Sequence, residues 1–128
     1  VVVGLTGDTT VNPKVVADWS YANGHRVEGI GTAWSLFPAG ARKWDIRCEE
    51  LSVSASQISQ KLREGKVVIT SMGKGHFTNN GHFIVLRGIT ENGKILVNDP
   101  NSREKSNKEW SVSIIVSEAK GAWAFSKP

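Results

Sequence analysis

The chain has 128 residues and a mass of 13.9 kDa, with 39% hydrophobic and 22% charged residues, so we expect a single domain over residues 1–128. No apolar run approaches the roughly 20 residues that span a bilayer, which argues against a membrane span. The net charge of +4 is spread over stretches of mixed sign, without a basic run, and this argues against nucleic acid as a partner. Weak attraction to anionic cell-wall polymers or phospholipid would account for the charge equally well.

The first elements predicted are an apolar segment and a helix. Val1–Leu5 predicts either a strand or the last turns of a helix that begins before Val1. Asn12-Pro13 is a typical helix start, and Gly24 is a typical stop. Four apolar residues between them share one face of this helix: Val15, Val16, Trp19 and Ala22.

A second helix and a strand are expected next. Residues 25–31 form a connection punctuated by glycines, and Thr32 is expected to cap a helix that holds Pro38 in its first turns. Asp45–Leu51 alternates between apolar and polar residues, as a half-exposed strand does.

The remainder of the chain predicts a third helix and most of a sheet. Ser54 and Gln57 have the spacing of a capping box, and Gly65 follows as a stop, so that Ile58 and Leu62 face the core. The expected strands are 66–72, 82–89, 94–99 and 122–125, with a mixed segment at 110–118. The fold class is therefore α+β, with the first helices packed on a mostly antiparallel sheet.

The segment from His82 to Asp99 carries the strongest functional pattern. His82 begins an apolar strand and Asp99 ends the next one, and the Asn-Gly pair in the connection Thr90–Gly93 predicts a hairpin. An antiparallel hairpin brings the start of one strand beside the end of the other. The imidazole and the carboxylate are thus expected to be neighbours, an arrangement in which the carboxylate orients a histidine general base. The alternatives are a structural core histidine and a turn aspartate in Asn-Asp-Pro-Asn.

These residues also carry a family resemblance. The motifs V-V-I-T-S-M-G, G-H-F-I-V-L and V-N-D-P, together with GTAWSLF and EAKGAWAF, resemble the C39-like branch of the papain-like cysteine peptidases over most of the chain. The resemblance implies a papain-like fold, in which a half-barrel sheet packs against a helix that bears a nucleophilic cysteine. It also implies that His82 is the base and Asp99 its orienting partner.

In this family the cysteine opens a Cys-Gly-Pro motif at the start of a helix that runs into a Leu-Thr-Gly-like turn. Val1–Gly7 resembles the end of such a helix, which would place the cysteine about two helical turns before Val1, with the oxyanion-hole glutamine before it. We therefore expect the 128 residues by themselves to be inactive. A further expectation is self-association through the apolar surface that the absent segment would cover.

Cys48 is the single cysteine of the sequence, so it forms no internal disulfide and no thiolate cluster. A nucleophilic cysteine needs a lowered pKa, from a helix N-terminus or a nearby imidazolium. Cys48 lies instead in an alternating segment directly before Glu49 and Glu50, whose charges disfavour a thiolate. It is interpreted as a structural residue.

Three other residues are candidates for substrate binding. His76 is expected to line a cleft near His82 or to cap a loop, Gly81 flanks His82, and Trp34 lies beside small residues. A metal site drawn from His76, His82 and either Asp99 or His25 matches no recognised zinc spacing. No metal or other cofactor is therefore expected. The Gly-Lys-Gly of 73–75 lacks the ending of a phosphate-binding loop and is expected to be an ordinary loop.

Two functions from different classes are consistent with the sequence. The first is a cysteine peptidase that acts on a peptide or peptidoglycan-like amide by Cys-His-Asp catalysis. By analogy with the family, such a domain would be bacterial and secreted or associated with the cell envelope. The second is a non-catalytic peptide-binding domain on the same fold. The identity of the residue at the nucleophile position discriminates between them.

Overall fold

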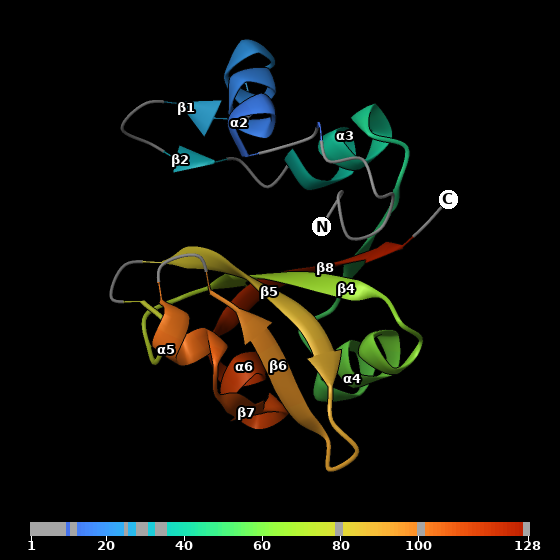
Figure 1. Cartoon of the computed structure of the whole chain (residues 1–128), viewed down its shortest axis with the longest axis vertical. Helices are drawn as coiled ribbons and strands as arrows, with labels where there is room; N and C mark the ends of the chain where they lie inside the picture. Colours follow the sequence, from blue (N-terminus) through green and yellow to red (C-terminus); the bar gives the residue numbers. More distant parts are fainter. Residues whose placement is uncertain are drawn as a thin grey trace. The chain divides into compact units, whose positions relative to one another are not determined.

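The computed structural model describes residue 10 and residues 13–24, 26–27, 31–32, 36–78, 81–99 and 102–126. These residues belong to two compact parts, one drawn from Val1–Cys48 with Ser126–Pro128 and the other formed by Glu49–Phe125 (Figure 1). The single domain over residues 1–128 stays a prediction, and the apolar segment Val1–Leu5 lies outside the described residues. No described helix has the length and apolar character needed to cross a membrane.

In the first part, helix α2 (Pro13–Ala22) begins at its proline, and the chain leaves it at Gly24 with a φ of +76°, as the sequence predicts. The side chain of Trp19 packs edge-on against Trp44, with ring centroids 5.3 Å apart. Val15, which the sequence places on the same helix face as Trp19, is 39% exposed. The apolar face that the sequence predicts is therefore not buried at Val15.

The connection between the first two helices differs from the prediction. Strands β1 (Arg26–Val27) and β2 (Gly31–Thr32) form a short antiparallel pair, and helix α3 runs over Leu36–Lys43. Thr32 therefore belongs to a strand and does not cap α3, because its backbone pairs with Arg26. Pro38 is the third residue of the helix, where its missing N–H costs no intrahelical hydrogen bond.

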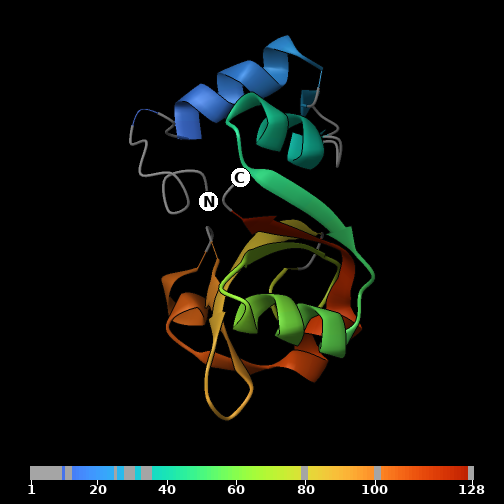
Figure 2. The same cartoon turned by 90° about the vertical axis from the view of Figure 1, so that its right-hand side faces the viewer.

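The second part is built on a sheet with the strand order β3-β8-β4-β5-β6-β7. The pairs β4–β8, β4–β5, β5–β6 and β6–β7 are all antiparallel, which confirms the predicted α+β class. Helices α4 (Ala55–Arg63) and α6 (Val112–Glu118) lie on one side of this sheet (Figures 1 and 2). The strands are β3 (Arg47–Leu51), β4 (Val67–Met72), β5 (His82–Ile89), β6 (Lys94–Asn98), β7 (Glu109–Ser111) and β8 (Ala119–Ser126).

Helix α4 begins and ends where the sequence predicts, although its capping differs. Ser54 is the N-cap residue, but its hydroxyl is hydrogen-bonded to Ser56 and accepts no backbone N–H. Gln57 accepts a hydrogen bond from the backbone N–H of Ser52, so the reciprocal capping box does not form. Gly65 follows the helix with a φ of +84°, a conformation that favours glycine.

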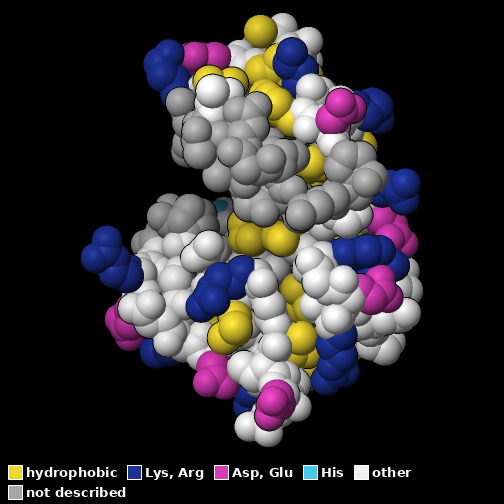
Figure 3. All heavy atoms as spheres, turned by 45° about the vertical axis from the view of Figure 1, so that its right-hand side comes forward, with side chains coloured by type: hydrophobic (Ala, Val, Ile, Leu, Met, Phe, Trp, Pro, Cys, Tyr) yellow, Lys and Arg dark blue, Asp and Glu magenta, His cyan; other side chains and the backbone are white. Residues whose placement is uncertain are grey.

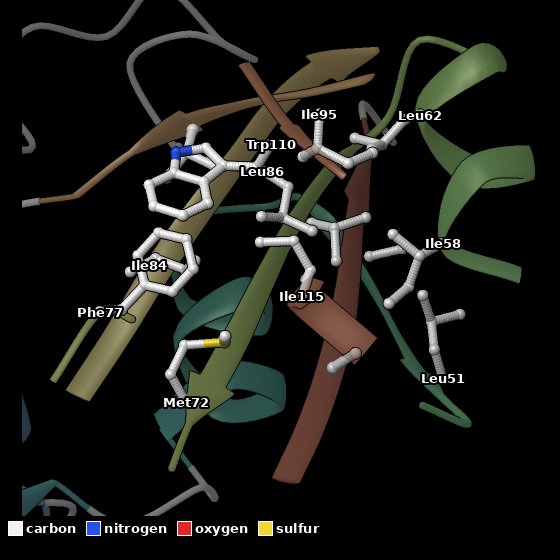
Figure 4. Packing of buried hydrophobic residues seen from close by; sticks show 14 residues of the cluster. Leu51, Ile58, Leu62, Met72, Phe77, Ile84, Leu86, Ile95, Trp110 and Ile115 are labelled. Atoms are coloured by element: carbon white, nitrogen blue, oxygen red, sulfur yellow. The ribbon is translucent and has the colours of Figure 1, made fainter. Parts of the chain in front are cut away.

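The core lies between the sheet and these two helices. Alternate residues of the central strands point to the same face, since side chains in a strand have a period of two. These residues pack with Ile58 and Leu62 of α4 and with Ile115 of α6 (Figure 4). The buried strand residues on this face include Val68, Met72, Ile84, Leu86, Ile95 and Val97.

Strands β5 and β6 form the predicted hairpin. Gly93 has a φ of +80° in the connection, and the N–H of Thr90 donates to the carbonyl of Lys94 at 2.8 Å. After β6 the chain forms helix α5 (Arg103–Ser106), a single turn that the sequence did not predict. Figure 1 shows α5 at the end of the sheet where β6 ends and β5 begins.

Candidate active site

The alternation of the hairpin strands places His82 and Asp99 on the same face of the sheet. His82 is two residues before the buried Ile84 in β5, and Asp99 is two residues after the buried Val97 of β6. The register pairs Val85 with Asn98, so its continuation by one residue brings Ile84 opposite Asp99. His82 is then the diagonal neighbour of Asp99, within reach of its side chain.

The two side chains meet in a hydrogen bond. Nε2 of His82 lies 3.1 Å from Oδ1 of Asp99, and their side chains are 14% and 0% exposed. An ionised carboxylate only accepts hydrogen bonds, so Nε2 carries the proton in this pair and Nδ1 of a neutral ring keeps its lone pair. Nδ1 makes no hydrogen bond within the part of the chain that the structure describes. This arrangement presents Nδ1 as a base and lets the carboxylate stabilise an imidazolium.

Helix α5 holds the backbone of Asp99. The N–H of Asp99 donates to the Ser106 hydroxyl at 2.8 Å, and the carbonyl of Asp99 accepts from the N–H of Ser102 at 3.2 Å. Ser102 is also the N-cap residue of α5, since its hydroxyl accepts from the N–H of Lys105 at 3.0 Å. The sequence predicts a turn over residues 98–101, of which 100 and 101 lie outside the described residues, and the roles of these serines were not predicted. Ser102 is a typical N-cap residue, and it is the feature of the sequence that could have indicated α5.

His76 lies in the loop between β4 and β5 and is bound to Glu118 at the end of α6. Both its backbone N–H and its ring Nδ1 are hydrogen-bonded to the Glu118 carboxylate. Its ring is also edge-on to Trp110, and its side chain is 58% exposed. These hydrogen bonds to Glu118 attach the loop that carries His76 to the end of α6. Its predicted role in substrate binding is not tested by these contacts and stays a prediction.

The glycines of this loop permit its close approach to Glu118. Gly73 donates its N–H to the carbonyl of Glu118 at 2.8 Å. A Cβ on Gly75 would overlap the Glu118 carboxylate, so a side chain there would displace it. The Gly-Lys-Gly segment is thus a loop, as predicted, and it packs against an acidic side chain.

Gly81 directly precedes the candidate base in a conformation that favours glycine. Its φ is +128°, and its N–H donates to the Thr78 hydroxyl at 2.9 Å. The next residue, His82, pairs with Met72 of β4, so this glycine sets the path by which the loop enters β5. Its role in substrate binding stays a prediction, and Trp34 lies outside the described residues.

Cys48 lies on β3 and is half-buried, in agreement with the predicted structural role. In the strand order, β8 and β4 stand between β3 and β5. The adjacent Glu49 forms an ion pair with Lys61 of α4 at 3.0 Å. Cys48 lies inside a strand and not at a helix N-terminus, and it directly precedes Glu49 and Glu50, whose charges disfavour a thiolate.

The described residues show no metal cluster, and the face drawn in Figure 3 shows no dominant patch of charge. No three of their His, Cys, Asp or Glu side chains gather closely enough to hold a metal ion. On the face drawn in Figure 3, Lys and Arg side chains are scattered among Asp and Glu side chains. The expectation that nucleic acid is not a partner stays a prediction.

Comparison with known proteins identifies the family and the fold of this chain. The profile of the Peptidase_C39 like family matches residues 4–127, so the chain belongs to this family. The fold is also similar to that of the peptidase domain of Streptococcus ComA, a bifunctional ABC transporter involved in a quorum-sensing pathway. That match has a TM-score of 0.60 and 16% sequence identity, and it covers 89% of this chain and 88% of the other. No curated protein matches the chain. The predicted family and its papain-like α+β fold are confirmed.

Proposed function

We propose that this chain is a cysteine peptidase domain that hydrolyses peptide or peptide-like amide bonds, with His82 as the general base and Asp99 as the residue that orients it. The observation that carries this proposal is the partly buried hydrogen bond between His82 and Asp99 at one end of the hairpin. Family membership over residues 4–127 supports the same reaction class.

The nucleophile is proposed to be a cysteine that precedes Val1 in the full-length protein. Nδ1 of His82 takes the proton of its thiol, and the thiolate attacks the carbonyl carbon of the scissile amide. The imidazolium then donates this proton to the leaving amine as the C–N bond breaks, which leaves a thioester. A water molecule, deprotonated by His82, attacks the thioester, and the thiol leaves with the returned proton. Asp99 stabilises the imidazolium in both steps.

The substrate and location follow as further proposals. A peptidoglycan-like or other peptide amide would suit a domain with this reaction class, and we place the protein among secreted or envelope-associated bacterial proteins. The net charge of +4 supports this location, since it favours attraction to anionic wall polymers. Direct cleavage assays with isolated peptidoglycan peptides and with unrelated peptides would establish the substrate.

Thiol alkylation tests the proposed function. The full-length protein and the 128-residue chain are treated with iodoacetamide across a range of pH. Rapid alkylation of the upstream cysteine at mildly acidic pH, lost in His82→Ala, is expected for an activated Cys–His pair. Alkylation that rises only near the ordinary thiol pKa of about 8.5 would overturn the proposal. A non-catalytic peptide-binding domain would then be the better interpretation.

A further inference from the structure

Asp99 lies just beyond the ladder that positions the rest of its strand. Strand β6 ends at Asn98, whose partner on β5 is Val85. The backbone of Asp99 is held instead by α5, through the Ser106 hydroxyl on its N–H and the N–H of Ser102 on its carbonyl. Helix α5 therefore helps to set the position of the Asp99 carboxylate.

The hydroxyl of Ser106 joins Asp99 to the helix itself. It accepts the Asp99 N–H at 2.8 Å and has one proton of its own to donate. The carbonyl of Ser102 lies 2.8 Å from it and that of Asp99 lies 3.3 Å away, so the proton is directed toward Ser102. The Ser106 side chain thus connects the last residue of α5 to the N-cap residue Ser102 and to Asp99, which contacts His82.

Helix α5 is in turn fixed to the core and to the loop that precedes His82. The indole N–H of Trp110 donates to the carbonyl of Lys105 at 2.9 Å, and the ring of Trp110 packs on Phe77 at a centroid distance of 4.4 Å. Figure 4 shows these two rings next to each other, close to Ile84. Lys105 Nζ also donates to the carbonyl of Phe77 at 3.2 Å. The same helical turn therefore contacts the segments that carry both members of the pair.

We propose that Ser106 is a positioning residue for the His82–Asp99 pair. It touches neither the imidazole nor the Asp99 carboxylate, and it acts by holding the backbone from which that carboxylate projects. The effect of Ser106 on catalysis rests on the proposed function. Its effect on geometry concerns only the hydrogen bond between Nε2 of His82 and Oδ1 of Asp99. Loss of the hydroxyl removes the acceptor of the Asp99 N–H and weakens the attachment of the end of β6 to α5, where the N–H of Ser102 still donates to the Asp99 carbonyl.

A matched pair of variants tests this role. Ser106→Thr keeps the hydroxyl, which in a helix can still bond the carbonyl four residues earlier, whereas Ser106→Val has nearly the same shape without it. Ser106→Ala removes the hydroxyl without added bulk and serves if the valine variant does not fold. Ser113→Ala is the control, since Ser113 is an exposed serine whose hydroxyl bonds only the neighbouring Ser111 hydroxyl at 2.8 Å.

The first measurement is the NMR signal of the His82 Nε2–H proton in full-length protein with ¹⁵N-labelled histidine. We expect a slowly exchanging signal in the wild type, Ser106→Thr and Ser113→Ala. In Ser106→Val or Ser106→Ala, exchange should be faster by about tenfold or more, because the hydrogen bond opens more often. An unchanged signal in both hydroxyl-free variants, with the fold intact by circular dichroism, would overturn the positioning role.

The second measurement is the alkylation rate of the upstream cysteine at mildly acidic pH. We expect it to fall on the order of 10- to 100-fold in the hydroxyl-free variants and to recover in Ser106→Thr, since a displaced catalytic group loses this much. A wild-type protein without rapid alkylation would contradict the proposed function, while the NMR signal would still decide the role of Ser106. Rapid alkylation that is equal in all variants would contradict the positioning role and leave the proposed function intact.

Discussion

Replacement of Asp99 by asparagine isolates the charge of the candidate pair. Asparagine has nearly the same shape, and its amide oxygen can still accept the hydrogen bond from Nε2 of His82, which is 3.1 Å from Oδ1 in the native pair. What the variant removes is a negative charge on a side chain with no exposed surface. Two unit charges about 4 Å apart attract by about 4 kcal/mol at an effective dielectric constant of about 20.

This attraction sets the expected loss of activity. About 1.4 kcal/mol corresponds to a factor of ten in rate, so complete loss of the attraction to the imidazolium would slow the reaction by about 10³-fold. The amide dipole recovers part of this stabilisation, and we therefore expect a loss of about 10²- to 10³-fold in Asp99→Asn. Alkylation of the upstream cysteine and hydrolysis of a peptide substrate should fall together.

The control for this experiment is Glu104→Gln. Glu104 is an exposed carboxylate on the adjacent α5, where it pairs with Lys108, so its removal changes the net charge equally without touching His82. Thermal unfolding of both variants would show that the fold is retained. If Asp99→Asn alkylated and hydrolysed at the wild-type rate, Asp99 would not be the partner that stabilises the base.

Three further predictions concern the core, the loop and the cysteine. Ile115→Ala should lower the free energy of unfolding by about 2–5 kcal/mol in urea titrations, because Ile115 is fully buried between α6 and the sheet. A loss below 1 kcal/mol, within the range of a surface substitution, would contradict the packing described here. Gly75→Ala should lower the free energy of unfolding by about 0.5–1.5 kcal/mol, the net value of one hydrogen bond, because its Cβ displaces the Glu118 carboxylate from the exposed N–H of His76. Gly40→Ala is its control: a Cβ there meets Trp44 at an ordinary 3.6 Å within a helix, so the change should be neutral or stabilising. Cys48→Ser should leave the alkylation of an activated cysteine unchanged, and loss of rapid alkylation in that variant would identify Cys48 as the nucleophile.

The parts of the fold that the sequence predicts are those set by local chemistry. A proline and a glycine bound α2, and the Asn-Gly turn with two alternating strands specifies the hairpin. Because a strand has a period of two, the positions of His82 and Asp99 relative to the buried residues could be read directly from that pattern. The adjacency of the candidate pair was therefore predictable before any tertiary contact was known.

The contacts that hold the pair were not predicted, because they come from a helix too short to give a periodic pattern of its own. Helix α5 has only four residues and is stabilised by its Ser102 cap and by Trp110, so its own sequence gives a weak signal. His76 and Glu118 are 42 positions apart, and nothing in either segment points to the other. The Ser54 capping box fails for a local reason, since Gln57 accepts from the backbone N–H of Ser52 instead of that of Ser54.

The choice of ring nitrogen restricts where a nucleophile can lie. Asp99 contacts Nε2, so proton transfer must use Nδ1, which is attached to the ring carbon that bears Cβ and therefore lies close to the backbone of His82. A thiol within hydrogen-bond reach of Nδ1 must approach the first residue of β5, beside the end of β4 at Met72. Cys48 lies on β3, and β8 and β4 separate this strand from β5 in the strand order. Strand order and family membership thus both support the proposal of a nucleophile other than Cys48.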